Sequence, residues 1–290
     1  MAKEDFFKRY IDVVELLRRK SVSSNDLQNY LNQNLKISLR TFQRDKGEIE
    51  RLYGIEIAFN KKEGLYKINE ELSDGSFDRI AESFHITQAL NKSNEVSKII
   101  LLEQRKSKGM ENMHGLLHAI HNRLVINFLH ESYWNYDIKK RKCVPIAIKE
   151  AQHRWYLIAF DIDKKEFRNY GLDRISDLEI STGKHTVPEF NIKEYYKNAF
   201  GIDAQGEPYK VILKIANYQK KFLNSLPLHH SQKIVEENET HFKLEFFIQL
   251  SHDFKTEILK LGSFCEVLEP IHFRNEVIEE INRLKNIYKK

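Results

Sequence analysis

The run from His153 to Asp161 constrains the fold of this chain more than any other stretch. Between its charged ends, nearly every residue is aromatic or aliphatic: Trp155-Tyr156-Leu157-Ile158-Ala159-Phe160. Successive side chains of a strand point to opposite faces, so both faces of this strand are apolar. Such a strand is typical of the interior of a closed barrel or sandwich. Residues 167–170 and 172–175 follow a charged turn, which predicts an antiparallel β-meander around this strand.

Three sequence blocks around this strand resemble the WYL domain of bacterial transcriptional regulators. They are Arg141-Lys142-Cys143-Val144-Pro145, then Trp155-Tyr156-Leu157, then Phe167-Arg168 with Leu172-Asp173-Arg174-Ile175. The tripeptide alone is a weak match, and the order of the blocks at strand-like spacing carries the resemblance. The resemblance implies a small Sm-like β-barrel that senses a ligand, with nucleotides or short nucleic acids as the ligand types. The residues alone predict that Trp155 and Leu157 are core side chains.

Length and composition favour a soluble protein of two or three domains. The chain has 290 residues, of which 41% are hydrophobic and 31% are charged. A formal net charge of +5 permits a nucleic-acid partner but does not require one. The charged N-terminus, the distant Cys143 and Cys265, and the absence of a long apolar run predict a cytoplasmic protein with no membrane association.

Residues 1–70 carry the pattern of a winged helix-turn-helix DNA-binding domain. Apolar spacing predicts three helices, the second capped by Ser23 or Ser24 and the third capped by Ser38. Two short strands, at 55–59 and 65–68, follow the helices. The turn between these strands has a basic tip that contains Lys61 and Lys62.

The third helix is the expected recognition helix. If Leu39, Phe42, Ile49 and Leu52 face inward, the outward side of its first turns can reach base edges and phosphates. Residues 38–45 also resemble the recognition-helix signature that commonly precedes WYL domains. The predicted DNA-binding residues are Ser38, Arg40, Thr41, Gln43, Arg44, Lys61 and Lys62. The alternative for the helix residues is an ordinary solvated face.

Residues 77–122 are expected to form a helical linker, with helices at 77–91, 95–104 and 110–122. In the last of these helices His114, His118 and His121 share one face, a spacing that could support a metal ion. An apolar stripe lies beside them, and no carboxylate or cysteine cluster completes a site. We therefore predict no metal and no cofactor.

Residues 123–185 and 207–290 complete an α+β chain. The first segment is the expected Sm-like WYL barrel, with strands at 124–129, 143–149, 154–160, 166–170 and 174–181 and with Pro145 at a strand start or edge. The second segment reads βαββαβ plus a closing helix, the ferredoxin-like plan. It resembles the C-terminal extension that often accompanies WYL domains, and its best matches are residues 228–232 and 268–270.

The predicted meander brings basic side chains together around Tyr156. Guanidinium groups beside an aromatic ring suit phosphate forks and ring stacking. The resemblance also associates basic residues at these positions with anionic ligands. The predicted ligand-binding residues are Arg141, Arg154, Tyr156, Arg168, Tyr170 and Arg174. The alternative is that each arginine pairs with a nearby acid, for example Arg174 with Asp173 or Asp177.

These features together favour a ligand-responsive transcriptional regulator. Its expected partners are a double-stranded DNA operator, a nucleotide or oligonucleotide effector, and a second copy in a homodimer that matches a two-fold operator. The sequence has no phosphate-cradling glycine loop, HExxH, GxSxG or paired-cysteine motif, so we predict that the chain is not an enzyme. The alternative is an RNA-binding module, although the last domain lacks the aromatic run of an RNA-binding sheet.

Overall fold

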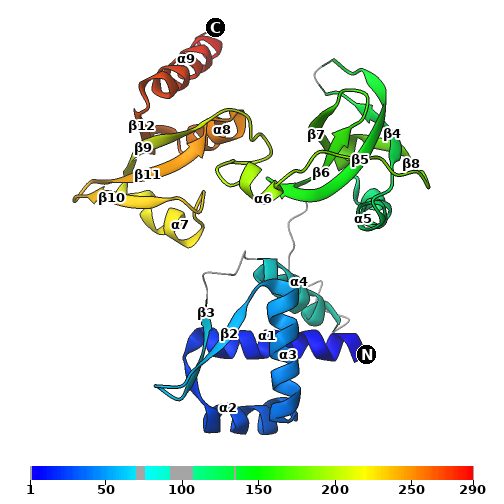
Figure 1. Ribbon diagram of the computed structural model, residues 1–290. Helices are drawn as coiled ribbons and strands as arrows, with labels where there is room; N and C mark the ends of the chain where they lie inside the picture. The colour runs from blue at the N-terminus through cyan, green and yellow to red at the C-terminus, as the bar shows by residue number, and fades with distance from the viewer. Residues whose placement is uncertain (1, 70–75, 92–106, 134, 290) are drawn as a thin grey trace. The chain divides into compact units, whose positions relative to one another are not determined.

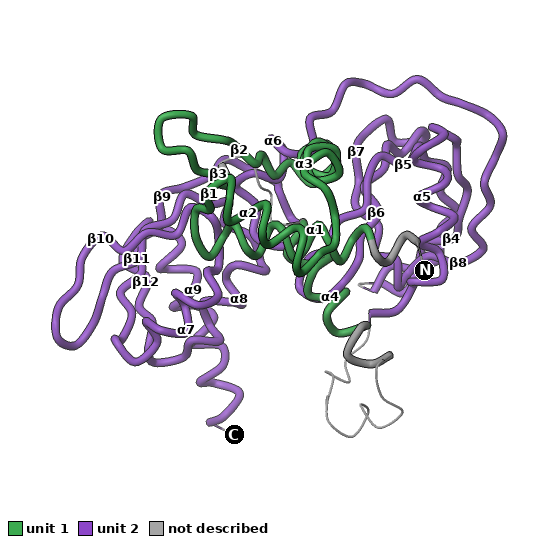
Figure 2. Tube along the Cα trace, turned by 90° about the horizontal axis from the view of Figure 1, so that it is seen from below, with its two compact units in different colours: residues 1–103 green, residues 104–290 purple. Residues whose placement is uncertain are grey.

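The computed structural model describes residues 2–69, 76–91, 107–133 and 135–289. The chain divides into two compact units, residues 1–103 and 104–290, shown in green and purple in Figure 2. Both units combine helices with antiparallel sheet. The helix predicted at 95–104 lies outside the described residues. Within the described part, no helix is both long enough and apolar enough to cross a membrane.

The first unit packs helices on a small antiparallel sheet, as the sequence predicted (Figure 1). The strand order is β1-β3-β2, and Phe59 of β2 pairs with Tyr66 of β3. In chain order the elements are α1 (Ala2–Arg19), β1 (Val22–Ser23), α2 (Ser24–Tyr30), the π-helical turn η1 (Leu31–Leu35), α3 (Leu39–Tyr53), β2 (Glu56–Asn60), β3 (Leu65–Asn69) and α4 (Ser76–Asn91).

Helix α3 begins and ends at the residues that its sequence signals indicate. The Ser38 hydroxyl accepts a hydrogen bond from the Thr41 backbone N–H, which confirms the predicted cap. The helix ends at Gly54, whose φ of 67° lies in the left-handed region that favours glycine. Ser23 caps α2 in the same way through the Asp26 backbone N–H.

The inward stripe of α3 differs from the expected one. Phe42 and Ile49 are fully buried, but Leu39 and Leu52 are 39% and 49% exposed, so the expectation that they face inward was wrong. The third buried position is Asp45, only 2% exposed. Positions 42, 45 and 49 follow helical spacing along the buried side of α3. Leu39 and Leu52 lie in the first and last turns of the helix, outside this buried stretch.

Asp45 is buried because α1 supplies its partner. Both Arg9 Nε and Arg9 Nη2 donate to Asp45 Oδ2, at 3.1 and 2.8 Å. The Arg9 guanidinium also lies 4.7 Å from the centre of the Phe6 ring. A carboxylate without this partner would be costly to bury, so the pair fixes which side of α3 faces α1.

The second unit opens with a helix and a five-stranded antiparallel sheet of order β7-β6-β5-β4-β8. Its elements are the 3₁₀ turn η4 (Met110–Asn112), α5 (Met113–Asn122), β4 (Ile126–Glu131), β5 (Ile138–Ala151), β6 (Arg154–Asp161), β7 (Glu166–Gly171), the 3₁₀ turn η5 (Leu172–Arg174) and β8 (Ile175–Ile180). The five predicted strands are all present.

Strand β6 is buried on both faces, which confirms the prediction made from its sequence. Leu157 and Ala159 pack in one cluster, where Trp155 is partly buried at the edge, and Phe160 packs in another with Val144. Pro145 lies inside β5 rather than at its start, but at a position where β5 pairs with β6 alone, because the ladder with β4 ends at Cys143. A bulge between Pro145 and Ala147 accommodates it, because the pairing with β6 shifts there and Pro145 has no N–H to donate.

The rest of the second unit is a four-stranded antiparallel sheet with helices, of strand order β10-β11-β9-β12. Alternate residues of β9 and β11 are buried, as their sequences predicted. The elements are α6 (Ile192–Tyr195), β9 (Pro208–Ala216), η6 (Asn217–Gln219), α7 (Lys220–Ser225), β10 (Lys233–Glu237), β11 (His241–Gln249), α8 (His252–Lys260), η7 (Gly262–Phe264), β12 (Cys265–Glu269) and α9 (Ile271–Ile287).

Replacing Arg9 with Met should weaken the first unit by about 3 kcal/mol, because Asp45 would keep its buried charge with only the longer 3.5 Å contact to the exposed Arg44. Both tryptophans of the chain, at positions 134 and 155, lie outside the first unit, so tryptophan fluorescence would not report its unfolding. Amide hydrogen exchange in α1 and α3 is therefore the suitable measurement.

Arg19→Met is the matched control, since Arg19 is 79% exposed and lies 3.6 Å from Glu15. It should change protection by less than about 0.5 kcal/mol. The double variant Arg9→Met/Asp45→Leu should recover most of the loss. Equal effects of Arg9→Met and Arg19→Met would contradict this role of the ion pair.

Candidate functional site

The first candidate surface is the N-terminal part of α3. Ser38 Oγ caps the helix at the Thr41 N–H and lies 3.1 Å from Thr41 Oγ1, so these two hydroxyls already bind each other. The amide Nε2 of Gln43 donates to the Tyr66 hydroxyl at 3.2 Å, which ties α3 to β3. These three residues therefore hold the surface in shape.

The two arginines of this surface extend from it. Arg40 is exposed, and the side chain of Arg44 is 65% exposed, with Nη2 3.5 Å from Asp45 Oδ1. Residues four positions apart lie on the same helix face, so both guanidinium groups serve one surface. Asp45, which Arg9 already neutralises, partly anchors the second of them.

The turn between β2 and β3 is preformed. Asn60 Oδ1 accepts hydrogen bonds from the backbone N–H groups of Lys62 and Glu63, at 3.0 and 3.4 Å. Gly64 completes the turn with a φ of 68°. The Lys61 and Lys62 side chains are exposed at its tip, beside the acidic Glu63.

The second candidate surface is built around a buried carboxylate in the five-stranded sheet. Asp161 Oδ2 accepts a hydrogen bond from the Tyr170 hydroxyl at 2.6 Å, and Oδ1 accepts from the backbone N–H groups of Asp163 and Lys164. Burial alone would raise the pKa of Asp161, but the hydrogen bonds from Tyr170 and Lys164 and the nearby Arg141 hold it below its ordinary value. Burial and the Asp161 hydrogen bond raise the pKa of Tyr170, so its hydroxyl remains a donor.

Arg141 and His130 lie beside this carboxylate and keep unused hydrogen-bonding capacity. Arg141 Nη1 is 3.9 Å from Asp161 Oδ2, and the His130 ring packs edge-on against Tyr170 with centres 5.0 Å apart. Within the described residues, the buried Nε of Arg141 and Nε2 of His130 have no hydrogen-bond partner. Burial, followed by the charges of Arg174 and Arg141, lowers the pKa of His130 to about 4, so the ring is neutral at pH 7.

Arg154 and Arg174 share a second carboxylate, Asp173. Arg154 Nη1 binds Asp173 Oδ2, and Arg174 Nε lies 3.8 Å from Oδ1. The Arg174 guanidinium is also 5.2 Å from the centre of the Tyr133 ring. Tyr133, Arg154 and Asp173 line a cavity of about 450 Å³, together with Ser107, Lys108, Gln152 and His153.

The structure brings together most of the predicted ligand-binding residues. The charges of Arg141 and Arg174 both lower the pKa of His130. The charges of Arg154 and Arg174 both lower the pKa of Tyr156, but burial outweighs them and raises it overall. Tyr170 lies nearby but is 2% exposed, so it supports the cluster from the core. We define the basic cluster as His130, Arg141, Arg154, Tyr156, Arg174 and the acids Asp161 and Asp173.

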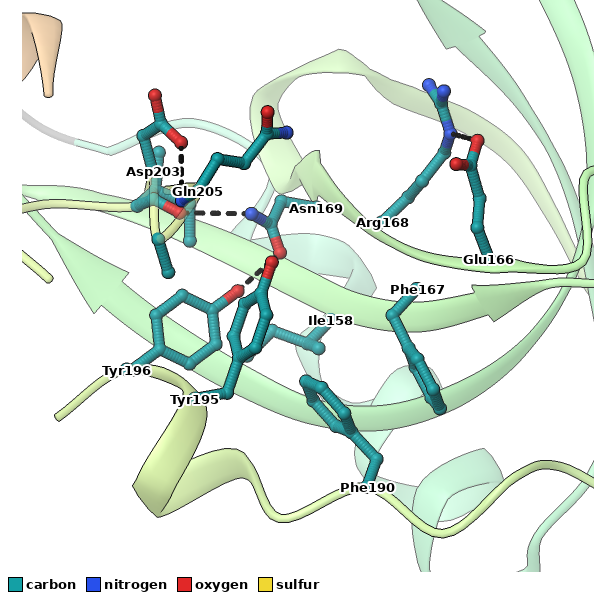
Figure 3. A pocket seen from close by; sticks show the side chains of 12 residues that line it. Ile158, Glu166, Phe167, Arg168, Asn169, Phe190, Tyr195, Tyr196, Asp203 and Gln205 are labelled. Atoms are coloured by element: carbon teal, nitrogen blue, oxygen red, sulfur yellow. Dashed lines mark hydrogen bonds and ion pairs between the residues drawn. The ribbon is translucent and has the colours of Figure 1, made fainter. Parts of the chain in front are cut away.

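Arg168 is not brought to the basic cluster. Its Nε binds Glu166 Oε1 at 2.6 Å, and it lines a different cavity, beside Asn169 (Figure 3). The expectation of four arginines around Tyr156 is therefore corrected to two, Arg154 and Arg174, with Arg141 beside His130 and Asp161 in the same cluster. The alternative pairing of Arg174 with Asp173 is present as well, in the same place.

Sequence reasoning missed His130, Tyr133 and Asp161, and it named Asp173 only as a possible partner of Arg174. The pairing of Arg141 with Phe128 in the β4–β5 ladder places His130 diagonally next to Arg141. Alternation of Ile126, Phe128 and His130 was the available signal that His130 faces the core side. Along α5, the described residues include no group of three His, Cys, Asp or Glu residues that could hold a metal ion.

Comparison with known proteins identifies both parts of the second unit. The family model described as the WYL domain matches residues 111–180, and the model described as the WCX domain matches residues 207–285. A search of curated proteins gives no match.

Two solved structures are similar to the chain at low identity. Proteasome accessory factor B/C (PafBC) of Arthrobacter aurescens is 16% identical, with a TM-score of 0.32 over 94% of this chain and 46% of that one. A CRISPR Cas-related protein is 15% identical, with a TM-score of 0.42 over 62% of this chain and 53% of that one. The chain thus spans about half the length of each. By its two family matches, the chain contains a WYL domain at residues 111–180 and a WCX domain at residues 207–285.

Proposed function

We propose that the chain is a ligand-responsive transcriptional regulator. Residues 1–70 act as a winged helix-turn-helix that binds a double-stranded DNA operator, and residues 77–122 link it to the sensor. Residues 123–185 form an Sm-like WYL barrel that binds an anionic effector, a nucleotide or short nucleic acid. Residues 207–290 form a ferredoxin-like extension that contributes to a homodimer.

The DNA-binding part of the proposal rests on one observation. Arg40 and Arg44 are exposed on α3, and the opposite side of this helix is held in place by buried contacts. Arg9 and Asp45 fix the buried side of α3, and Ser38 fixes its start. A helix held in this way can present its first turns to a major groove. Two guanidinium groups on one face can each fork onto guanine or hold a phosphate, and the lysines of the β2–β3 turn add phosphate contacts.

The charge balance of the basic cluster supports an anionic effector. Three guanidinium groups, those of Arg141, Arg154 and Arg174, face two carboxylates, Asp161 and Asp173. Lys108 lines the cavity and Asp253 lies near Tyr156, so these two charges offset each other and one positive charge is left over. A phosphate would balance it and would offer acceptors to donors that Asp173 does not saturate. Effector binding would act on DNA affinity only if it favours one of two states of the regulator.

The C-terminal extension supports the assembly part of the proposal. Strand order β10-β11-β9-β12, with helices after β9 and β11, is the βαββαβ arrangement of ferredoxin-like domains. Helix α9 exposes Ile278, Ile281 and Leu284 at 43%, 49% and 43%. Apolar side chains grouped on one helix in this way are typical of a surface that pairs with another chain.

Replacing Arg40 and Arg44 with Ala tests the DNA-binding part. Each change should cost about 1–3 kcal/mol if the side chain reads a base, or reduce the salt slope by about one if it holds a phosphate. Fluorescence anisotropy with duplexes from the chain's own upstream region, at several salt concentrations, separates the two cases.

Arg51→Ala is the control within the same helix, because Arg51 lies in the last turn and binds Glu48 at 2.6 Å. It should leave DNA affinity unchanged within about twofold. If the Arg40→Ala/Arg44→Ala double variant binds the cognate duplex as tightly as the Arg51→Ala variant, the assignment of α3 as the recognition helix is wrong.

Replacing Arg154 or Arg174 with Ala tests the effector site. Each loss of a charge-assisted contact should weaken binding of a 5′-phosphorylated dinucleotide by about 10-fold or more. Bound phosphate should also raise the pKa of His130 from about 4, because an opposite charge favours the protonated ring. Calorimetry and histidine NMR with and without the dinucleotide measure the two effects.

Arg168→Ala is the matched control, since Arg168 binds Glu166 away from the basic cluster. It should leave dinucleotide binding unchanged within about twofold. Equal losses in the Arg168→Ala and Arg174→Ala variants, or a His130 pKa that does not move at saturation, would contradict the effector site.

A further inference from the structure

A separate cavity of about 320 Å³ lies against strands β6 and β7 (Figure 3). Its sheet side is made by Ile158, Phe167 and Asn169. Its other side is made by residues 190–205, part of the connector (residues 181–207) that leads from β8 to β9. None of these residues belongs to the basic cluster, so the cavity has no part in the function proposed above.

One wall of the cavity is a set of interlocked aromatic rings. Phe167 and Phe190 stack with centres 4.1 Å apart and planes at 16°, and Tyr195 packs on Phe190 at 5.0 Å. Rings held by one another in this way form a wall that a ligand does not have to organise. Tyr195 remains 40% exposed, so part of its surface is available to a flat molecule.

The facing wall is polar, and its key amide is already oriented. The Tyr196 hydroxyl donates to Asn169 Oδ1 at 2.6 Å, and Asn169 Nδ2 donates to the Ile202 carbonyl at 3.0 Å (Figure 3). Burial raises the pKa of Tyr196, so its hydroxyl stays protonated and keeps donating. A side-chain amide has two donor hydrogens and two acceptor positions, so one of each is left on the exposed Asn169.

The charge of this cavity is opposite to that of the basic cluster. Glu166 and Arg168 bind each other and cancel, and in Figure 3 they point away from the aromatic rings. Among the residues that line the cavity this leaves the Asp203 carboxylate, whose Oδ1 also accepts a hydrogen bond from the Gln205 backbone N–H at 3.1 Å. The Lys149 ammonium lies 5.2 Å from the centre of the Tyr196 ring but is not one of the lining residues. A single uncancelled carboxylate disfavours a phosphate and favours a ligand that brings N–H donors.

We propose that this cavity binds a planar nitrogen heterocycle that carries an exocyclic amino group and no phosphate, the chemical class of adenosine and cytidine. The ring stacks against Tyr195, and its amino group donates to Asp203. Asn169 pairs with the ring-nitrogen edge through its remaining donor and acceptor. Carboxylates that accept from amino groups, and amides that pair with an amino group and a ring nitrogen, recognise bases in the same way elsewhere.

Ligand binding here would fix the connector on β7. The opposite side of the connector is already held by the C-terminal sheet, where Gln249 Nε2 donates to the carbonyls of Ala204 and Gly206 at 2.9 and 2.8 Å. Gln249 N also donates to the Asn198 carbonyl at 2.8 Å. A bound heterocycle should therefore slow amide exchange of residues 196–206 in particular.

Calorimetry of the full chain with adenosine, cytidine, uridine and adenosine monophosphate tests the proposal. Adenosine or cytidine should bind. Uridine lacks the amino group, and the monophosphate adds negative charge, so each should bind at least about 10-fold more weakly. Tyr195→Ala and Asp203→Asn should each reduce affinity by about 10-fold or more. Asp203→Asn keeps an oxygen for the Gln205 N–H, so it removes charge while keeping the turn.

Tyr209→Ala and Asp163→Asn are the matched controls and should bind as the wild type does. Tyr209 is 42% exposed, on β9, and Asp163 is exposed in the β6–β7 turn. Absence of adenosine and cytidine binding at about 1 mM would overturn the proposal. Affinity that falls in Arg174→Ala but not in Tyr195→Ala would also overturn it, because the ligand would then occupy the basic cluster.

Discussion

The WYL domain depends on one buried charge, the carboxylate of Asp161. An ionised group that is 1% exposed persists only if it is paired and hydrogen-bonded, and Asp161 obtains its partners from three places. The backbone of the β6–β7 turn, the Tyr170 hydroxyl and the Arg141 guanidinium all converge on it. These contacts fix Tyr170 in the core and draw Arg141 inward beside His130. The positions of Arg141 and His130 in the basic cluster therefore follow from the contacts that hold the buried Asp161 carboxylate at the end of β6.

The first unit uses the same device in a different place. Asp45 on α3 and Arg9 on α1 form a buried pair between two helices that are distant in sequence. Such a pair adds little net stability compared with an apolar contact, but it opposes rotation of α3 about its axis, because rotation would leave a charge unpaired. Arg40 and Arg44 then remain on the outer side. In both units a buried acid fixes the direction of exposed arginines.

Local sequence signals were sufficient for the elements but not for these long-range partners. The apolar run of β6, the Ser38 cap and the alternation in β9 and β11 each depend on neighbouring residues, and each prediction was confirmed. Leu52 was expected to be buried because it is apolar, whereas the polar Asp45 occupies the core position. Strand order suggested that Arg168 would lie with the other arginines around Tyr156. In the structure Arg168 binds Glu166, two residues away, and lies outside the basic cluster. Partners such as Arg9 for Asp45, 36 positions apart, leave no periodic trace in the sequence.

In the proposed function the chain binds a specific DNA duplex, and the WYL domain's ligand changes this binding. The most direct measurement is a gel shift of the full chain with three probes of equal length: the duplex upstream of its own gene, a scrambled duplex and a single-stranded RNA. Each probe is tested with and without a 5′-phosphorylated dinucleotide. A regulator should prefer its own duplex to both competitors by about 10³-fold or more at physiological salt, and the dinucleotide should change that affinity. Tighter binding to the single-stranded RNA, with no preference between the duplexes, would contradict the account and identify an RNA-binding protein instead.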